Sequence, residues 1–344
     1  MNGAATTPVS VLDLASITQG GSPGDAFERT VAHAREADRL GFQRIWLAEH
    51  HNLDGIASAA TAVLIGHVAA QTQRIRVGSG GVMLPNHAPL VIAEQFGTLE
   101  TLYPGRIDLG LGRAPGTDGA TARALRGANA LQEPDFAELL AELRGYLAPA
   151  RDQQKVRAIP GQGLDIPIWL LGSSGYSAQL AGQLGLPFAF ASHFAPRHLM
   201  DALRLYREVF QPSAVLDEPY AMVAMNVITA DTDAEAERLA TSVKQRFLRM
   251  IRNQRGRLDP PVDTMDGLWS RQEQAMVENT LSASAFGAPE TVRETINHFL
   301  DTTGANELII TNDVYDAAAR LRSLQLLAEV MMPGPGGAAD AGAG

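Results

Sequence analysis

Short runs of apolar residues alternate along this chain with longer segments whose apolar positions recur at helical spacing. Most of the short runs are continuous rather than alternating in polarity, which is typical of strands buried on both faces of a parallel sheet. The first helical stripe contains Phe27, Val31, Ala34, Ala37 and Leu40. The strand-like runs occupy residues 9–14, 44–50, 75–84, 106–112, 166–172, 187–193, 220–230 and 307–311.

The order of these elements predicts an α/β fold with parallel strands and right-handed helical crossovers. Eight strand–helix repeats in a chain of 344 residues favour closure into a (β/α)8 TIM barrel. An open, doubly wound sheet is the alternative. We therefore expect residues 9–332 to form a single barrel domain.

Three stretches depart from the alternation. Residues 253–288 are too long and irregular for an ordinary barrel connection, so they predict an insertion before the last strand: a mobile loop or lid with a short helix inside it. Residues 1–8 are expected to be disordered. The Gly-, Ala- and Pro-rich residues 333–344 are expected to form a disordered tail, because they cannot bury enough apolar surface.

Composition excludes several classes of function. The 45% hydrophobic content supports a large core, and 28 basic against 38 acidic residues give a net charge of −10 with no basic cluster, which argues against a nucleic-acid partner. The absence of cysteine rules out disulfides, thiolate metal sites and thiol nucleophiles. Neither an export signal nor a membrane-length apolar run is recognisable, so we expect a soluble, cytoplasmic protein.

The second strand-like run ends in the polar residues Glu49, His50 and His51. Adjacent strand residues point to opposite faces, so His50 and His51 cannot readily chelate one ion, and no familiar metal-ligand spacing is present. No metal is therefore predicted. Histidines hydrogen-bonded at a strand end are one interpretation. A functional imidazole that transfers protons near neutral pH is the interpretation that we favour.

Glycine and small polar residues follow three further strand-like runs. Gly80 and Gly81 indicate either a bulge or a planar ligand against bare backbone. Arg113 follows a strand at a position where it can bind a phosphate or form a surface ion pair. Five residues, Ser173, Ser174, Gly175, Tyr176 and Ser177, lead into a helix, where free backbone amides and the helix dipole favour an anion. A serine N-cap accounts for only one of them.

Four motifs in fixed order carry a resemblance to a known family. They are Ala-Glu-His-His at 48–51, Gly-Gly-Val-Met-Leu-Pro at 80–85, Pro-Gly-Arg-Ile-Asp-Leu-Gly-Leu-Gly-Arg at 104–113 and Gly-Ser-Ser at 172–174. Together they resemble the bacterial luciferase-like flavin monooxygenases over residues 9–332. The resemblance implies a TIM barrel that binds FMN at the carboxyl ends of its strands.

Residue roles follow from this resemblance. It implies that His50 is catalytic, that Gly80 and Gly81 lie beneath the isoalloxazine, and that Arg113 with residues 173–177 binds the phosphate. Arg123 or Arg126 is the candidate for a second phosphate cation, a choice that the sequence leaves open. The remaining expected pocket residues are Glu49, Met83, His193 and Phe194.

The implied reaction oxygenates a small organic substrate by way of a flavin hydroperoxide. Reduced FMN from a separate NAD(P)H-dependent flavin reductase acts as co-substrate with dioxygen. Luciferases carry a cysteine at the position of Gly112, so light emission is not expected. A deazaflavin-dependent oxidoreductase and a noncatalytic flavin-binding or partner subunit are the alternatives. The resemblance also implies a homodimer formed through the helices after the second and third strands.

Overall fold

A computed structural model describes residues 7–114, 118–127 and 135–332 of the chain. Residues 1–6 and 333–344, for which the sequence predicts disorder, lie outside this described part. Within it, no helix is long and apolar enough to cross a membrane.

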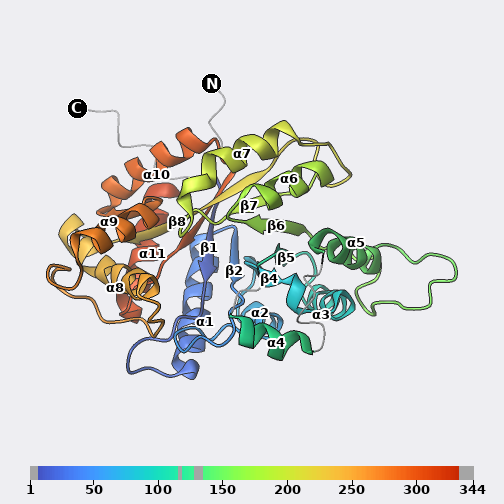
Figure 1. The fold of residues 1–344 in the computed structure, drawn as a ribbon, viewed down its shortest axis with the longest axis horizontal. Coiled ribbons are helices and arrows are strands. Elements are labelled where there is room, and N and C mark those ends of the chain that lie inside the picture. Colours follow the sequence, from blue (N-terminus) through green and yellow to red (C-terminus); the bar gives the residue numbers. More distant parts are fainter. Residues whose placement is uncertain (1–6, 115–117, 128–134, 333–344) are drawn as a thin grey trace.

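Eight parallel strands close into a barrel at the centre of the molecule (Figure 1). Each strand pairs with its neighbour around the ring, and β10 pairs with both β1 and β8, which closes it. All eight predicted strand segments are present, and the predicted TIM barrel is confirmed. The barrel strands are β1 (Val9–Asp13), β2 (Arg44–Leu47), β3 (Arg76–Ser79), β5 (Ile107–Gly112), β6 (Ile168–Gly172), β7 (Phe188–Phe190), β8 (Ala221–Thr229) and β10 (Glu307–Thr311).

Two short strands supplement the barrel. Strand β4 (Val82–Met83) follows β3 after the Gly80-Gly81 peptide bond, which is cis, and pairs with the carboxyl end of β5. Strand β9 (Ser284–Gly287) pairs with the last residues of β8, outside the ring. The sequence analysis did not predict β9.

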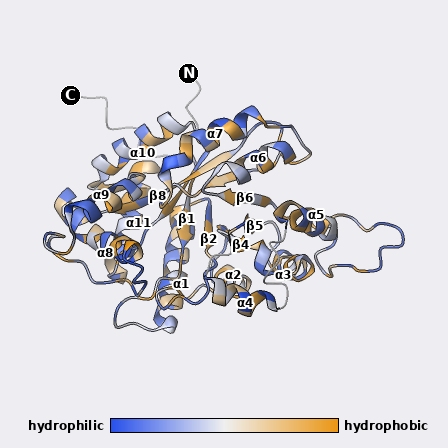
Figure 2. Ribbon diagram, in the orientation of Figure 1, coloured by the Kyte–Doolittle hydropathy of each residue, from blue (hydrophilic) through white to orange (hydrophobic). Residues whose placement is uncertain are grey.

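Helices surround the barrel, and their apolar faces cover the strands (Figures 1 and 2). Figure 2 shows hydrophobic colour on the central strands and hydrophilic colour mainly on the peripheral helices. The helices are α1 (Pro23–Leu40), α2 (Thr61–Ala69), α3 (Pro89–Leu102), α4 (Gly119–Arg126), α5 (Phe136–Leu147), α6 (Gly175–Leu184), α7 (Leu199–Glu208), α8 (Asp233–Ile251), α9 (Arg271–Thr280), α10 (Pro289–Thr303) and α11 (Ala317–Met331), with 3-10 turns η1 (Leu84–Asn86) and η3 (Pro196–His198).

The first helix shows how local sequence sets the helix ends. Ser22 and Asp25 form a reciprocal capping box at the start of α1. Gly41 ends the helix with a φ of 90°, a left-handed conformation that glycine adopts without steric cost.

The segment 253–288 contains the predicted short helix, α9, and also the unpredicted strand β9. Its first part runs past the loops that follow β1 and β2. Leu258 forms a bridge with Thr18, and a Cβ on Gly55 would come within 2.1 Å of the carbonyl oxygen of Gly256. The segment therefore packs against the carboxyl end of the barrel, where those loops lie.

Charged side chains fill the barrel interior at the amino ends of its strands. Arg44 donates to Glu307 and to Asp108, at 2.7 Å in each case, and Arg76 donates to Asp108 at 2.7 Å. The guanidinium of Arg44 also lies 4.8 Å from the ring centre of Trp169. Burial opposes its charge, but Asp108 and Glu307 hold the pKa of Arg44 above its usual value.

Candidate functional site

The sequence-predicted site residues meet at the opposite end of the barrel. Glu49 and His50 follow β2, Arg113 follows β5, Ser173 and Ser174 follow β6, and His193 follows β7. The carboxyl ends of parallel barrel strands form one rim, so these residues share a single mouth. The rim is therefore the candidate active site.

Two imidazoles of this rim are partly buried and neutral. The Nδ1 atoms of His50 and His193 are buried and have no hydrogen-bond partner among the described residues. Burial lowers the pKa of His50 to about 4 and that of His193 to about 3. Both rings are thus uncharged at neutral pH and retain an unused ring nitrogen. His193 also packs edge-on against Phe194, with ring centres 4.8 Å apart.

An ion pair that the sequence analysis missed lies beside these imidazoles. Arg246 of α8 pairs with Asp313, which follows β10 and also accepts a hydrogen bond from Ser16 at 3.0 Å. The positive charge of Arg246 contributes to the lowered pKa of both His50 and His193. For Asp313, its position directly after the last strand was a sequence signal that could have indicated a site residue. Arg246 lies within a helix, and nothing in the local sequence indicates its role.

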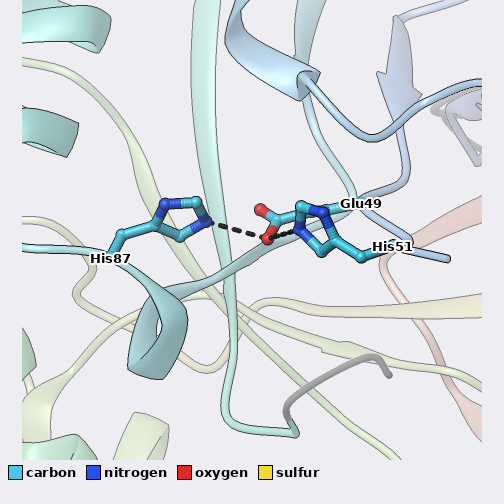
Figure 3. A group of neighbouring side chains, drawn as sticks. All are labelled: Glu49, His51 and His87. Atoms are coloured by element: carbon cyan, nitrogen blue, oxygen red, sulfur yellow. Dashed lines mark hydrogen bonds and ion pairs between the residues drawn. The ribbon is translucent and has the colours of Figure 1, made fainter. Parts of the chain in front are cut away.

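Glu49 is the centre of a second polar cluster (Figure 3). Its Oε1 lies 2.9 Å from Nε2 of His51 and 2.8 Å from Nε2 of His87, and its Oε2 accepts the Met83 amide at 3.1 Å. The carboxylate is 1% exposed. Burial alone would raise the pKa of Glu49, but hydrogen bonds from His87 and His51 hold it below its usual value.

The cluster has the donor atoms of a metal site in a combination that the sequence analysis did not consider. The sequence places His50 beside His51, whereas the structure brings His51 and His87 together on Glu49, with the three ligand atoms within 4.8 Å of one another. Each nitrogen-to-oxygen distance is that of a direct hydrogen bond. The cluster is therefore satisfied without an ion.

Packing inside the barrel accounts for Gly81 and favours glycine at position 80. A Cβ on Gly81 would lie 2.8 Å from the carbonyl oxygen of Gly110, which is fixed backbone. A Cβ on Gly80 would lie 2.7 Å from the end of the Leu12 side chain, which can shift, and 3.0 Å from the Cβ of Trp46. Packing therefore explains these glycines without a ligand, although their bare backbone would also admit one.

Arg113 and the start of α6 form a candidate anion site. The Arg113 guanidinium stacks 4.4 Å from the ring centre of Tyr176 and makes no hydrogen bond or ion pair with the described residues. Ser174 is the N-cap of α6, but its side chain makes no capping hydrogen bond. Among the described residues no side chain therefore caps the first helical amides, which is the condition that an anion site at a helix start requires.

Of the two candidates for a second phosphate cation, Arg123 and Arg126, only Arg126 has a side-chain partner among the described residues that bears on its position. Arg126 of α4 donates from Nε to the Asn86 side chain at 3.1 Å, which places it next to η1. This leaves the choice between Arg123 and Arg126 open.

Together the barrel and its rim define a TIM-barrel protein with a candidate anion site and neutral imidazoles at the carboxyl ends of its strands. The model of the luciferase-like monooxygenase family matches residues 7–307. The chain belongs to this family of oxidoreductases.

Relatives match over nearly the whole chain. YvbT of Bacillus subtilis (strain 168) is 57% identical over 325 residues, covering 94% of this chain and 96% of that protein. A luciferase-like monooxygenase of Escherichia coli (strain K12) is 53% identical over 325 residues, covering 94% and 97%. The solved structure of apo-MsnO8 is 34% identical with a TM-score of 0.84, covering 95% and 98%.

More distant structures share the fold alone. One is the oxygenating constituent of 3,6-diketocamphane monooxygenase of Pseudomonas putida in complex with FMN, at 21% identity and a TM-score of 0.72, covering 96% and 98%. Another is an F420-dependent secondary alcohol dehydrogenase, at 15% identity and a TM-score of 0.67, covering 95% and 98%.

Proposed function

We propose that this protein is a monooxygenase that uses reduced FMN and dioxygen to insert one oxygen atom into a small organic substrate, with the second atom leaving as water. The observation that carries the proposal is that Arg113, which has no polar partner among the described residues, stacks on Tyr176 at the start of α6, on the same rim as the neutral imidazole of His50. The residues that would bind a phosphate and the residue that would transfer protons therefore lie on the same rim of the barrel.

The residues present fit FMN. Arg113 and the α6 amides of residues 175–177 would hold its phosphate, with Ser173 and Ser174 beside them. The cis peptide of Gly80 and Gly81 would lie beneath its ring. When bound, the reduced flavin supplies the two electrons that activate dioxygen.

The chain's own groups would control protons and water at the mouth. Burial lowers the pKa of His50 to about 4, so its imidazole is neutral at neutral pH and would serve as a hydrogen-bond partner and transient proton acceptor for the reacting groups. His193, Phe194 and Met83 would line the substrate pocket, and segment 253–288 would act as its lid. Substrate identity depends on the shape of this pocket.

Two alternatives give different observations. A deazaflavin-dependent oxidoreductase would bind F420 in preference to FMN and would consume no oxygen. A noncatalytic partner subunit would bind flavin without turnover, whereas the neutral imidazole of His50, whose Nδ1 has no partner among the described residues, argues for catalysis. In our proposal an NAD(P)H-dependent flavin reductase supplies reduced FMN in the cytoplasm. The protein acts as a homodimer through α2 and α3, where Val63 is 74% exposed.

The function is tested by anaerobic titration with reduced FMN and then by rapid mixing with oxygen. We expect saturable binding of reduced FMN and, after mixing, a transient flavin absorbance distinct from those of oxidised and reduced FMN. A parallel titration with F420 is the control. Tight F420 binding without FMN binding would support the deazaflavin alternative instead.

Arg113→Ala should weaken FMN binding by about tenfold to a hundredfold, because a charge-assisted hydrogen bond contributes roughly 1.5–3 kcal/mol. Quenching of flavin fluorescence measures the change. Arg293→Ala, on the exposed surface of α10, is the matched control and should bind FMN normally. Native affinity in Arg113→Ala would remove the phosphate assignment.

A further inference from the structure

Glu49 receives hydrogen bonds from three separate parts of the rim. His51 belongs to the same loop as Glu49, Met83 belongs to β4, and His87 caps the end of η1 before α3. Figure 3 shows both imidazoles directed at one carboxylate oxygen from opposite sides. The other oxygen is occupied by the Met83 amide. Glu49 therefore holds both ends of the short segment 83–87 against the end of β2.

The segment that Glu49 holds also contacts the anion side of the rim. The Met83 sulfur packs on Gly112, where a Cβ would come within 2.9 Å of it, and Gly112 directly precedes Arg113. Asn86 accepts a hydrogen bond from Arg126 at 3.1 Å. Arg113 and Arg126, which is one of the two candidates for the second phosphate cation, are thus linked to this segment.

We propose that Glu49 is a positioning residue. By holding segment 83–87 in place, it sets how tightly the site binds the FMN phosphate. The inference rests on the proposed function. Glu49 would act through packing rather than through contact with the phosphate. If Met83 or His87 were released from Glu49, Met83 would shift away from Gly112, and Asn86 would shift together with Arg126. Flavin affinity should therefore depend on a carboxylate that does not contact the phosphate.

Glutamine is the informative replacement because it keeps the shape of glutamate. Its amide nitrogen donates and cannot accept, so either the Met83 amide or the two imidazoles would lose an acceptor at a buried site. Glu49→Gln should raise the Kd for FMN about tenfold, the consequence of one unpaired buried donor. The Kd for riboflavin, which has no phosphate, should rise less than about threefold on the same scale.

Control variants separate this role from a structural one. Glu36→Gln removes a surface carboxylate that likewise accepts two side chains, Arg39 and Gln325, and should bind FMN normally. His87→Leu removes one donor and leaves Glu49 charged, so it should weaken FMN binding in the same direction even if Glu49→Gln fails to fold. A lowered Tm in Glu49→Gln with native FMN affinity would overturn the proposal.

A double-mutant cycle with Arg113 gives the decisive measurement. If Glu49 acts by positioning the phosphate-binding residues, Glu49→Gln should weaken FMN binding less in the Arg113→Ala background than in the wild type, because one of the two contacts of segment 83–87 with those residues is then lost. Additive losses would overturn the positioning role. Stoichiometric zinc in the purified wild-type protein, absent from Glu49→Gln, would also overturn it, because Glu49, His51 and His87 would then be metal ligands. Absence of FMN binding by the wild-type protein would instead refute the proposed function.

Discussion

His50→Ala is expected to lower substrate oxidation by at least about a hundredfold, the usual contribution of a positioned proton-transfer group, while FMN binding stays close to that of the wild type. His50 lies on the rim apart from the anion site, and its Nδ1 has no partner among the described residues. Oxygen consumption should continue and yield hydrogen peroxide in place of product. The measurement is the ratio of product to oxygen consumed.

His298→Ala, on the exposed face of α10, is the matched control for His50 and should keep native coupling of product to oxygen. Unchanged product yield in His50→Ala would make the imidazole structural. Loss of FMN binding in that variant would indicate that His50 holds the cofactor rather than moving a proton.

The pH profile gives a second readout of the same assignment. The neutral ring is the active form, so activity falls as pH drops through its pKa, at about 4 rather than 6.5. The profile of kcat/KM should therefore stay level from pH 7.5 to about 6, a range over which an ordinary histidine with a pKa near 6.5 would become mostly protonated. A half-loss near pH 6.5 that persists in a substrate-saturated, folded enzyme would contradict this.

Protein stability has to be followed in the same pH experiment. The unfolded chain protonates His50 and His193 near pH 6.5, whereas the folded chain does so only near 4 and 3. The unfolded state thus binds more protons in this window, so the free energy of unfolding falls as pH drops below 6.5. Tm measured across the range separates loss of fold from loss of catalysis.

Arg44→Met is expected to lower the free energy of unfolding by roughly 3–5 kcal/mol, the usual cost of removing one partner from a buried ion pair. The substitution leaves Glu307 without its guanidinium partner inside the barrel, while Arg76 still pairs with Asp108. Urea unfolding at constant pH measures the loss. The variant should retain the rim geometry in the folded fraction, because Arg44 lies at the other end of the strands.

Two further variants serve as controls for the stability loss in Arg44→Met. Arg39→Met breaks an ion pair with Glu36 in which the arginine side chain is 63% exposed, so it should cost less than about 1 kcal/mol. Adding Glu307→Gln to Arg44→Met should recover part of the loss by removing the unpaired charge. A loss below about 1 kcal/mol for Arg44→Met alone would show that water or relaxation replaces the ion pair.

The barrel was readable from the sequence because its strands are buried on both faces. Most of the eight ring strands lie in largely apolar runs, and the helices between them carry regular stripes. Strand β9 was missed since its Ser-Ala-Phe-Gly sequence is short and pairs with one neighbour only, the end of β8. A strand defined by a single partner leaves little pattern in its own residues.

The sequence by itself determined the barrel and the placing of His50, Arg113 and residues 173–177 at strand ends, because local patterns of burial, glycine and polarity mark those positions. Only the tertiary structure decided what these residues meet. Glu49 and His87 are separated by 38 positions, and Arg246 reaches Asp313 across 67. Neither contact leaves a local signature, since each depends on how the barrel closes and how its loops turn back over the rim.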